Sequence, residues 1–309
     1  MQKINAWIDE LGYQDYTLET MTADASFRKY YRLSVHDESF VLMDSSENKE
    51  SIYPFIDISV RLLKAQVEVP RIISQNLQEG FLLLSDLGTQ HLADMLSPMS
   101  VQLLYMKGIS EIIKMQNIDV SGLDVYDKNF LMAEMNLMEE WYLRQHKKMF
   151  LSEKGLNNLN VLLESIADEV LTQPQGIFVH RDFHSRNIML EAGRLALIDY
   201  QDAMSGALTY DLVSILKDVY VEFDRAKMEE LALEFKALKG LEVSDEAFLR
   251  WCDFTALQRH IKILGIFARL DIRDGKSDYL QDIPLTLKYI LEVCEKYESV
   301  KPLAELLKR

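Results

Sequence analysis

One stretch of the sequence decides the fold: His180-Arg181-Asp182-Phe183-His184-Ser185-Arg186-Asn187. Two short apolar runs, 187–190 and 195–198, follow it and flank Glu191-Ala192-Gly193-Arg194, whose composition is typical of a hairpin turn. Asp199 comes directly after the second run. We therefore expect a two-stranded hairpin that brings Asn187 and Asp199 to the same end.

The spacing His-Arg-Asp-x-x-x-x-Asn, with an Asp after a hairpin, is the catalytic-loop pattern of kinases. In that pattern Asp182 accepts or orients the proton of an attacking hydroxyl, while Asn187 and Asp199 offer oxygens to Mg²⁺ that bridges nucleotide phosphates. An isolated loop Asp or Asn more often caps a helix or forms a turn. Here all parts occur in register, which favours a kinase-type site. We expect His180 to brace the loop, and His184 is a candidate for substrate contact.

Length and composition indicate a well-packed globular protein. The chain has 309 residues, of which 48% are hydrophobic and 27% charged. This length fits two lobes around a cleft better than one compact unit. The formal net charge is −15, from 34 Lys and Arg against 49 Asp and Glu. Such a charge repels nucleic acids and anionic membranes, so we expect neither as a partner, while a nucleotide can still bind through local cations, backbone amides and a metal ion.

The sequence also favours a cytoplasmic location. Residues 1–18 contain early acidic residues and no apolar signal-peptide core, and no apolar run reaches the length of a membrane span. Cys252 and Cys294 stand apart, without the spacing of a zinc site. We therefore expect buried, reduced thiols in the cytosol. No feature of the sequence points to an obligate protein partner.

Apolar periodicity predicts an α+β protein, with a sheet region first and helices after it. A helix is expected within 1–16 and another over 51–65, and strands at 27–35, 40–43, 67–73 and 81–84. Ser85-Asp86-Leu87-Gly88 ends the last strand, so we expect an N-lobe over 1–86 and a C-lobe over 87–309. Helices of the C-lobe are expected over 101–117, 129–149, 156–172, 211–220, 227–238, 245–270 and 284–296.

The catalytic-loop stretch resembles the aminoglycoside phosphotransferase and choline kinase branch of the protein-kinase-like fold. Four further segments are spread over nearly the whole chain: Ala25-Ser26-Phe27-Arg28-Lys29-Tyr30-Tyr31-Arg32, Leu83-Leu84-Ser85-Asp86-Leu87-Gly88, Ile198-Asp199-Tyr200-Gln201-Asp202-Ala203 with Tyr210-Asp211-Leu212, and Gln258-Arg259-His260-Ile261-Lys262 to Asp274-Gly275-Lys276. These segments resemble the bacterial anomeric N-acetylmuramate/N-acetylglucosamine kinases of cell-wall recycling. The region 258–276 carries the likeness to that subfamily.

The resemblance implies a protein-kinase-like bilobal fold, with an antiparallel-sheet N-lobe and a mainly helical C-lobe. It also implies ATP- and Mg²⁺-dependent phosphorylation at the anomeric hydroxyl of a cell-wall amino sugar. Asp182 would then be the base, with Asn187 and Asp199 as metal ligands. The strand-loop-strand around Ser26 would cover the phosphates, and the hinge against adenine would be formed by Ser85, Asp86 and Leu87.

The sequence departs from protein kinases at the phosphate cover. No glycine occurs between Gly12 and Gly80, so the chain lacks their glycine-rich loop. Ser26 can supply a hydroxyl and a backbone amide instead. Positive charge can come from residues that are otherwise solvated edge-strand charges, namely Arg28, Lys29 and Arg32.

The strand lysine of kinases is also missing. The third strand carries Met43 where a phosphate-binding lysine is expected. Either Lys29 or Lys49 takes that role, or the usual lysine–glutamate pair is absent and Glu47 and Glu50 are surface acids. The sequence leaves both possibilities open.

The acceptor is expected to be a small molecule, because the segment between Asp199 and Asp211 is too short for a peptide-docking activation loop. Candidate residues for contacting this acceptor are Glu134, Trp141, His184, Asp202, Arg259 and His260. Some have a structural alternative: Trp141 fits an apolar core stripe, and Glu134 fits a solvated face. Asp211 is expected to brace the catalytic loop.

Two other functions remain open from the sequence. An aminoglycoside, choline or another amino alcohol would suit an acidic protein, whereas Arg and His near the presumed cleft suit an acceptor with a carboxylate. A non-catalytic kinase-like module would explain the missing lysine and glycine loop, but it has no need of Asp182, Asn187 and Asp199 together. Neither a P-loop nor a dinucleotide-binding fingerprint occurs in the sequence.

Overall fold

The computed structural model describes residues 1–21, 28–191 and 193–308. The chain divides into two compact units. Unit 1 comprises Met1–His91 and Ile188–Asp202, and unit 2 comprises Leu92–Asn187 and Ala203–Arg309. The boundary expected near Leu87 lies close to the end of the first part of unit 1, whereas the hairpin that the sequence reading places in the C-lobe groups with unit 1.

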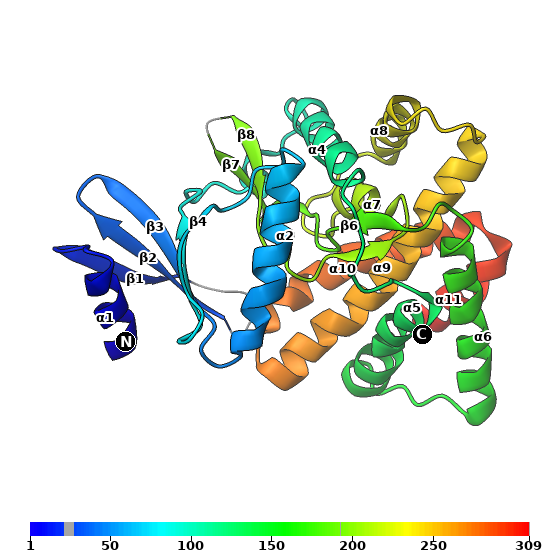
Figure 1. The fold of residues 1–309 in the computed structure, drawn as a ribbon. Helices are drawn as coiled ribbons and strands as arrows, with labels where there is room; N and C mark the ends of the chain where they lie inside the picture. Colours follow the sequence, from blue (N-terminus) through cyan, green and yellow to red (C-terminus); the bar gives the residue numbers. More distant parts are fainter. Residues whose placement is uncertain (22–27, 192, 309) are drawn as a thin grey trace. The chain divides into compact units, whose positions relative to one another are not determined.

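Unit 1 is built on a five-stranded antiparallel sheet (Figure 1). Its order is β1 (Tyr16–Met21), β2 (Lys29–Val35), β3 (Glu38–Asp44), β5 (Phe81–Ser85) and β4 (Ile72–Asn76). Helix α1 (Gln2–Glu10) covers one face, because its apolar side chains recur at helical spacing and pack on inward-facing residues of the three central strands. This cluster consists of Ile4, Trp7, Ile8, Leu33, Leu42, Phe81 and Leu83.

The hairpin expected after the catalytic loop is confirmed. It consists of β7 (Ile188–Glu191) and β8 (Arg194–Leu197), with Ile188 paired to Leu197. Just beyond β8, Tyr200 is buried against α2 (Ile52–Lys64), which follows the short helix η1 (Lys49–Ser51). The Tyr200 hydroxyl lies 2.7 Å from that of Ser59. The contact therefore anchors the segment that carries Asp199.

Unit 2 is mainly helical. Its short strands β6 (Ile177–Val179) and β9 (Met204–Gly206) pair with each other, and its longest helix is α9 (Asp245–Asp274). The other helical segments are α3 (Leu92–Met95), α4 (Val101–Met115), α5 (Lys128–Leu137), the π-helix η2 (Met138–His146), α6 (Glu153–Val170), η3 (Ser185–Asn187), α7 (Tyr210–Leu216), α8 (Arg225–Leu238), η4 (Ser277–Asp282), α10 (Ile283–Lys296), η5 (Glu298–Val300) and α11 (Lys301–Leu307).

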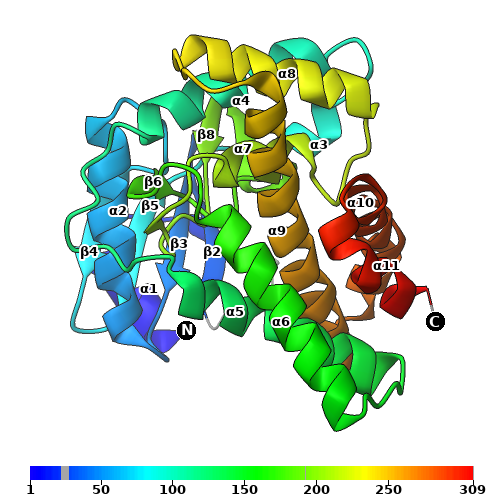
Figure 2. The same cartoon turned by 90° about the vertical axis from the view of Figure 1, so that its right-hand side faces the viewer.

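Helix α9 is the central helix of unit 2 and packs against α5, η2, α6, α7, α8 and α10 (Figure 2). The Ser244 side chain caps its start by accepting a hydrogen bond from the N–H of Ala247 at 3.1 Å. Gly275 ends it with a left-handed φ of 67°. Between these ends, long runs of consecutive residues are buried, which is typical of a core helix rather than a surface helix.

The structure differs from the predicted elements in a few places. The edge strand predicted at 67–73 was misplaced, since β4 lies at Ile72–Asn76; Pro70 has no N–H for the ladder. Strand β1 was missed, although the alternation of Tyr16 and Leu18 with polar residues signals it. The helix predicted over 129–149 changes to a π-helix after Leu137. Among the described residues, no helix combines the length and hydrophobicity needed to cross a bilayer.

Helix α9 approaches the junction of α5 and η2 closely at Gly265. A Cβ atom at this position would lie 2.3 Å from the carbonyl carbon of Leu137 and 2.5 Å from the backbone nitrogen of Met138. Neither backbone atom can move without displacing a helix, so only glycine fits. At Gly108 of α4, by contrast, the nearest atom to an added Cβ is the flexible Cδ1 of Ile215, at 2.7 Å.

We expect Gly265→Ala to lower the free energy of unfolding by about 3 kcal/mol, because the added methyl group overpacks a backbone contact. Gly108→Ala is the matched control, since both changes give the same gain of about 1 kcal/mol in helix propensity. It should stay within about 1 kcal/mol of the parent protein. Urea unfolding followed by circular dichroism measures both values. Equal effects of the two substitutions would contradict the close approach at Gly265.

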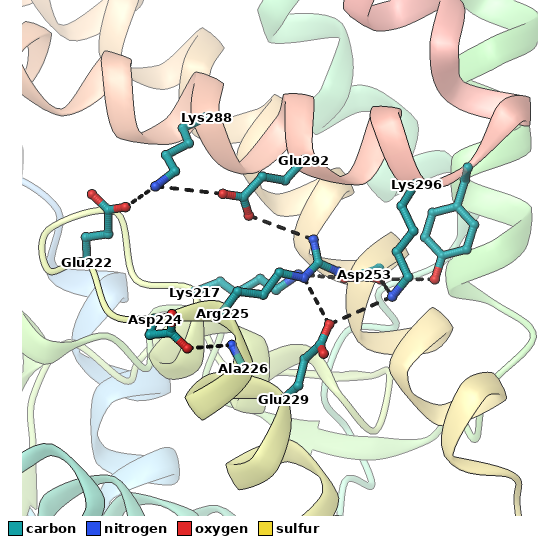
Figure 3. A network of polar contacts seen from close by, with 11 residues as sticks. Lys217, Glu222, Asp224, Arg225, Ala226, Glu229, Asp253, Lys288, Glu292 and Lys296 are labelled. Carbon is teal, nitrogen blue, oxygen red and sulfur yellow. Dashed lines mark hydrogen bonds and ion pairs between the residues drawn. The ribbon is translucent and has the colours of Figure 1, made fainter.

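A buried carboxylate, Asp253 of α9, connects the ends of three other helices (Figure 3). It lies 2.7 Å from Nζ of Lys217 after α7 and 2.8 Å from Nζ of Lys296 at the end of α10. Arg225 at the start of α8 lies 3.4 Å away, and the Tyr297 hydroxyl donates to Asp253 at 3.0 Å. Burial alone would raise the pKa of Asp253, but the two lysines outweigh it and lower the pKa to about 2.

We expect Asp253→Asn to cost about 3 kcal/mol of stability, because it leaves buried cations without their counter-charge. The pKa of Asp253 is lowered on folding, so its contribution is complete above the ordinary value near 3.8 and is lost only as the pH falls towards 2. The cost measured by urea unfolding should therefore be the same at about pH 5.5 and about pH 8.

The matched control is Asp168→Asn. Asp168 also pairs with a lysine, at 2.7 Å from Lys128, but its side chain is 61% exposed. An exposed pair contributes at most about 0.5–1 kcal/mol. A similar cost for both substitutions would show that Asp253 is no more important than a surface carboxylate.

Candidate active site

The loop that carries Asp182 is held by one buried carboxylate, Asp211 in the first turn of α7. One of its oxygens accepts a hydrogen bond from the N–H of His180 at 2.7 Å, and the other accepts from the N–H of Arg181 at 3.1 Å. Arg181 has a φ of 76°, a left-handed conformation that non-glycine residues rarely adopt without restraint. The two hydrogen bonds supply this restraint, so the bracing role expected of Asp211 is confirmed.

The side chain of Arg181 is fixed by a second set of contacts. It lies 2.7 Å from Glu134 of α5 and faces the rings of Tyr126 and Phe130, at 5.5 and 5.2 Å from their centroids. Nζ of Lys262, on α9, lies 3.1 Å from Glu134. Glu134 is therefore a buried ion-pair partner of two cations, and the alternative of a solvated acid is wrong.

Asp182 lies among positively charged groups. Burial alone would raise the pKa of its carboxyl, but the surrounding positive charges outweigh burial and hold the pKa well below its ordinary value. These charges belong to Lys262, His184, Arg259 and Arg181. Asp182 is therefore a carboxylate at neutral pH, and it can accept a hydrogen bond or a proton from a hydroxyl.

Asn187 and His184 contact the same loop. Nδ2 of Asn187 donates to the backbone carbonyl of Asp182 at 3.1 Å and lies 3.3 Å from Nε2 of His184. The His184 ring meets the edge of Tyr220 at a centroid distance of 5.1 Å. Burial lowers the pKa of His184 to about 4. At neutral pH its imidazole is therefore uncharged, and the positive charge acting on Asp182 comes from the lysine and the two arginines.

Asp218 also holds this loop, and the sequence reading missed it. Its carboxylate accepts hydrogen bonds from the N–H of Ser185 at 2.8 Å and from the N–H of Tyr220 at 3.0 Å. Asp218 is 1% exposed. It lies beyond the end of α7 at Leu216, so helical spacing from Asp211 does not place it, and no local signal in the sequence indicates this role.

In unit 1, Asp199 is held in an uncommon backbone conformation after β8. Its φ is 62°, in the left-handed region. Nε2 of Gln201 donates to the carboxylate of Asp199 at 2.9 Å and to that of Asp202 at 3.2 Å. Conformations of this kind cost about 1–3 kcal/mol and cluster at functional sites. The geometry agrees with a functional role for the Asp199 carboxylate.

The segment after β5, where the sequence predicts a hinge, is tied to β2 by an ion pair. Nε and Nη2 of Arg32 lie 2.7 and 3.2 Å from the carboxylate of Asp86. Nη2 also donates to the carbonyl of Gly88 at 3.0 Å, and the Ser39 hydroxyl donates to Asp86 at 2.6 Å. Arg32 is therefore not a solvated edge-strand charge, because it holds this segment in place.

The other predicted hinge residues also make contacts within unit 1. The hydroxyl of Ser85 accepts a hydrogen bond from the N–H of Arg71 at 2.9 Å. Leu87 is buried in a small cluster with Met189 of β7 and Ala196 of β8. These contacts fix the backbone of 85–88 on both sides.

The predicted phosphate-cover residues lie near the start of β2. Arg28 is buried, and its Nη2 lies 3.4 Å from the carbonyl oxygen of Ser51. Lys29 is exposed and pairs with Glu47 at 2.6 Å. Ser26 lies outside the described residues. A role of these residues at the phosphates stays a prediction.

The residues that could replace the strand lysine of kinases lie at different positions in unit 1. Met43 is buried in the sheet. Lys49 donates to the backbone carbonyl of Gln78 at 2.5 Å, and Glu50 is exposed. A lysine–glutamate pair does occur in unit 1, between Lys29 and Glu47, but at exposed positions.

Two predicted acceptor residues take part in the packing of unit 2, one partly buried and one fully buried. Trp141 packs against its main hydrophobic core. His260 is buried, with its ring stacked on Tyr289 at a centroid distance of 5.0 Å, and its Nε2 lies 2.9 Å from the carbonyl oxygen of Lys217. Burial lowers the pKa of His260 to about 3, so its neutral imidazole donates to that carbonyl. A contact of either residue with substrate stays a prediction.

A cavity of about 420 Å³ opens in unit 2 beside the Asp253 network, and none of the predicted site residues lines it. Its walls combine apolar and charged side chains, and the charges of opposite sign are paired with each other, as between Lys288 and Glu222. The lining residues are Leu216, Lys217, Glu222, Phe223, Asp224, Arg225, Met228, Lys288, Tyr289 and Glu292.

Comparison with known proteins places this geometry in context. Residues 17–252 match the model of the phosphotransferase enzyme family. The chain is 35% identical to the N-acetylmuramate/N-acetylglucosamine kinases of Pseudomonas aeruginosa and Neisseria meningitidis, over 99% of this chain and 95% and 94% of those proteins. Solved structures of an ADP-bound aminoglycoside phosphotransferase and of choline kinase from Streptococcus pneumoniae are each similar with a TM-score of 0.61, at 13% identity over 94% of this chain and 98% of theirs.

The sheet of unit 1, the helical unit 2 and the braced His-Arg-Asp loop define a protein-kinase-like phosphotransferase. The fold class and the family resemblance expected from the sequence are confirmed. The chain belongs to the phosphotransferase enzyme family.

We expect Asp211→Asn to lower stability by about 2–3 kcal/mol, because the amide keeps one acceptor oxygen and turns an NH₂ group towards a backbone N–H. The amides of His180 and Arg181 should then exchange with deuterium faster than in the parent protein. Asp224→Asn is the matched control. Asp224 also accepts from two backbone N–H groups, but with the same oxygen, which asparagine retains. If both variants behave alike, Asp211 does not brace the loop.

Proposed function

We propose that this protein is an ATP-dependent kinase that phosphorylates the anomeric hydroxyl of N-acetylmuramate and N-acetylglucosamine. Three relatives that carry this name align along almost the whole chain. The observation that carries the proposal is the Asp182 carboxylate, held ionised on a loop that Asp211 braces. Because such a kinase works where ATP is available, we also propose a cytoplasmic location.

In this proposal Asp182 acts on the acceptor. Its carboxylate would accept a hydrogen bond from the anomeric hydroxyl and orient the oxygen towards the γ-phosphorus of ATP. As the new oxygen–phosphorus bond forms, the bond from the γ-phosphorus to the β–γ bridging oxygen would break, ADP would leave, and Asp182 would take up the proton. The carboxylate is already ionised at neutral pH, so no deprotonation has to precede this step. The bracing of the loop keeps Asp182 in place and therefore reduces the reorganisation that the reaction requires.

The residues proposed to hold Mg²⁺ fit that ion in their chemistry. Asn187 uses Nδ2 in the contacts described above, so Oδ1 is its natural metal ligand, and Asp199 offers a carboxylate. Within the described ranges, no group of three or more His, Cys, Asp and Glu residues could hold a metal by itself. Mg²⁺ in kinases is held by one or two protein oxygens together with phosphates. When bound, it neutralises charge on those phosphates.

For the nucleotide, we propose that Ser85, Asp86 and Leu87 lie against adenine and that Ser26, Arg28 and Lys29 lie towards the phosphates. Arg32 would act indirectly, by keeping the hinge segment on β2 through its ion pair with Asp86.

A cationic acceptor is the second candidate, since structural neighbours include an aminoglycoside phosphotransferase and a choline kinase. The net charge of −15 favours it. The charges next to Asp182 oppose it, because Arg259, which Glu134 does not pair with, would repel an amine. We therefore place the amino sugars first.

Purified protein with Mg²⁺ and ATP should convert both sugars to products whose phosphate is bonded to the anomeric carbon, as ³¹P and ¹H NMR would show. Choline and an aminoglycoside should give no product under the same conditions. A phosphate at any other position, or turnover of the amines alone, would overturn the proposal.

We expect Asp182→Asn to lower kcat by about a thousandfold, because the amide cannot take up the proton. The Kd for ATP should stay within about threefold, as Asp182 is proposed to act on the acceptor and not on the nucleotide. Asp168→Asn, at an exposed site, serves as the control and should keep the parent kcat. Retention of full activity in the Asp182 variant would exclude this residue as the base.

A further inference from the structure

Arg259, in the middle of α9, is a buried cation with two guanidinium nitrogens that have no hydrogen-bond partner in the described residues. The residue is 3% exposed. Its Nε and Nη1 are buried and have no hydrogen-bond partner among the residues that the structure describes. A buried donor without a partner costs about 1–3 kcal/mol, and more when it is charged. Arg259 therefore has donors suited to a group that the protein itself does not supply.

The other two fixed cations near Asp182 differ from Arg259 because each pairs with a carboxylate. Arg181 lies 2.7 Å and Lys262 lies 3.1 Å from the carboxylate of Glu134. Nζ of Lys262 also lies 3.3 Å from the Tyr210 hydroxyl. Glu134 thus compensates two of the three cations, while Arg259 has no comparable carboxylate partner in the described part of unit 2.

Arg259 lies at the catalytic loop. Its positive charge contributes to lowering the pKa of both Asp182 and His184, and it acts on Tyr220, whose ring packs against His184. Neither Nε nor Nη1 donates to the Asp182 carboxylate. The guanidinium is therefore near Asp182, which is proposed to hold the acceptor hydroxyl, but its Nε and Nη1 form no hydrogen bond to the Asp182 carboxylate.

We propose that Arg259 binds a carboxylate of the acceptor and thereby determines how well the enzyme uses N-acetylmuramate. The inference rests on the proposed amino-sugar kinase function. A guanidinium binds a carboxylate through two parallel hydrogen bonds from its planar fork, either from Nε and Nη2 or from Nη1 and Nη2. Each of these two edges of Arg259 contains one of the unpartnered nitrogens, Nε or Nη1. N-acetylmuramate carries a carboxylate on its lactyl ether, and N-acetylglucosamine is the same sugar without that group.

This pair of acceptors separates recognition of the carboxylate from every other role of Arg259. Both sugars present the same anomeric hydroxyl to Asp182, so a change in chemistry or in folding affects both. Only a contact with the lactyl carboxylate affects N-acetylmuramate alone. Arg259 is in this sense a residue that determines specificity, and Asp182 remains the base.

The experiment measures kcat and KM for both sugars with the parent enzyme, Arg259→Gln and Arg259→Lys. In the Gln variant, kcat/KM for N-acetylmuramate should fall about a hundredfold, mainly through KM, because one partner of a charge-assisted pair is removed. For N-acetylglucosamine it should change less than about threefold. The Lys variant keeps the buried charge without the fork and should lose about tenfold for N-acetylmuramate.

Two controls accompany these variants. Arg269→Gln removes a second arginine of α9, which is only partly buried, and should leave the ratio of the two kcat/KM values unchanged. The methyl ester of N-acetylmuramate keeps the shape of the sugar without its charge, and the parent enzyme should use it as poorly as Arg259→Gln uses the acid. Binding of N-acetylmuramate to each variant without nucleotide, measured by calorimetry, gives a readout that does not depend on turnover.

The outcomes distinguish this inference from the proposed function. If the parent enzyme phosphorylates both sugars and the Arg259 variants lose both equally, Arg259 has a structural role or acts on the phosphoryl group, and the inference is wrong. If the parent enzyme uses N-acetylglucosamine and neither binds nor uses N-acetylmuramate, the kinase function stands without the carboxylate contact. If neither sugar reacts or binds, both proposals fail. If Arg259→Gln does not fold, the comparison of both sugars with Arg259→Lys decides whether Arg259 contacts the carboxylate or has a structural role.

Discussion

The hydrogen bonds from the N–H groups of His180 and Arg181 to the Asp211 carboxylate are the contact on which the active site depends. They hold Arg181 at a φ of 76°, which the residue would not adopt alone. With the backbone turned in this way, the Arg181 side chain reaches Glu134 on one side, and Asp182 follows directly after it. The backbone position of the proposed base thus depends on one buried carboxylate in the first turn of α7, whereas its ionised state depends on the cations around it.

Helix α9 connects the catalytic loop to the other helices of unit 2. Near its start, Asp253 gathers the cations that end α7 and α10 and begin α8. Near its middle, Lys262 compensates Glu134 at the catalytic loop. One turn further, Gly265 lets the backbone of α5 and η2 approach without a side chain between them. Because a helix is rigid over this length, the close packing at Gly265 and the position of Lys262 at the catalytic loop depend on each other.

The features of the fold and the site that depend on local sequence signals could be predicted from the sequence. The hairpin after the catalytic loop, the loop itself and the role of Asp211 could be predicted because each rests on residues close together in the chain or on a spacing with a known geometry. The pairing of Arg32 with Asp86 could not, because it requires the register of β2, β3 and β5. The ion pairs of Glu134, which the sequence offers as an acceptor contact or a solvated acid, could not be predicted for the same reason: its two cations come from distant segments, and only packing brings them together.

The cations around Asp182 have a chemical consequence for the proposed reaction. They hold its pKa low, which makes its carboxylate a weak base. An ordinary alcohol would gain little from such a base, whereas the hydroxyl at an anomeric carbon is more acidic, because the ring oxygen withdraws electrons from it. Phosphoryl transfer also passes through a loose transition state, in which the attacking oxygen forms little bond early and keeps its proton late. A weakly basic, firmly oriented carboxylate is therefore suited to an anomeric acceptor, and the positive charges that weaken it as a base also favour an acceptor that is itself an anion.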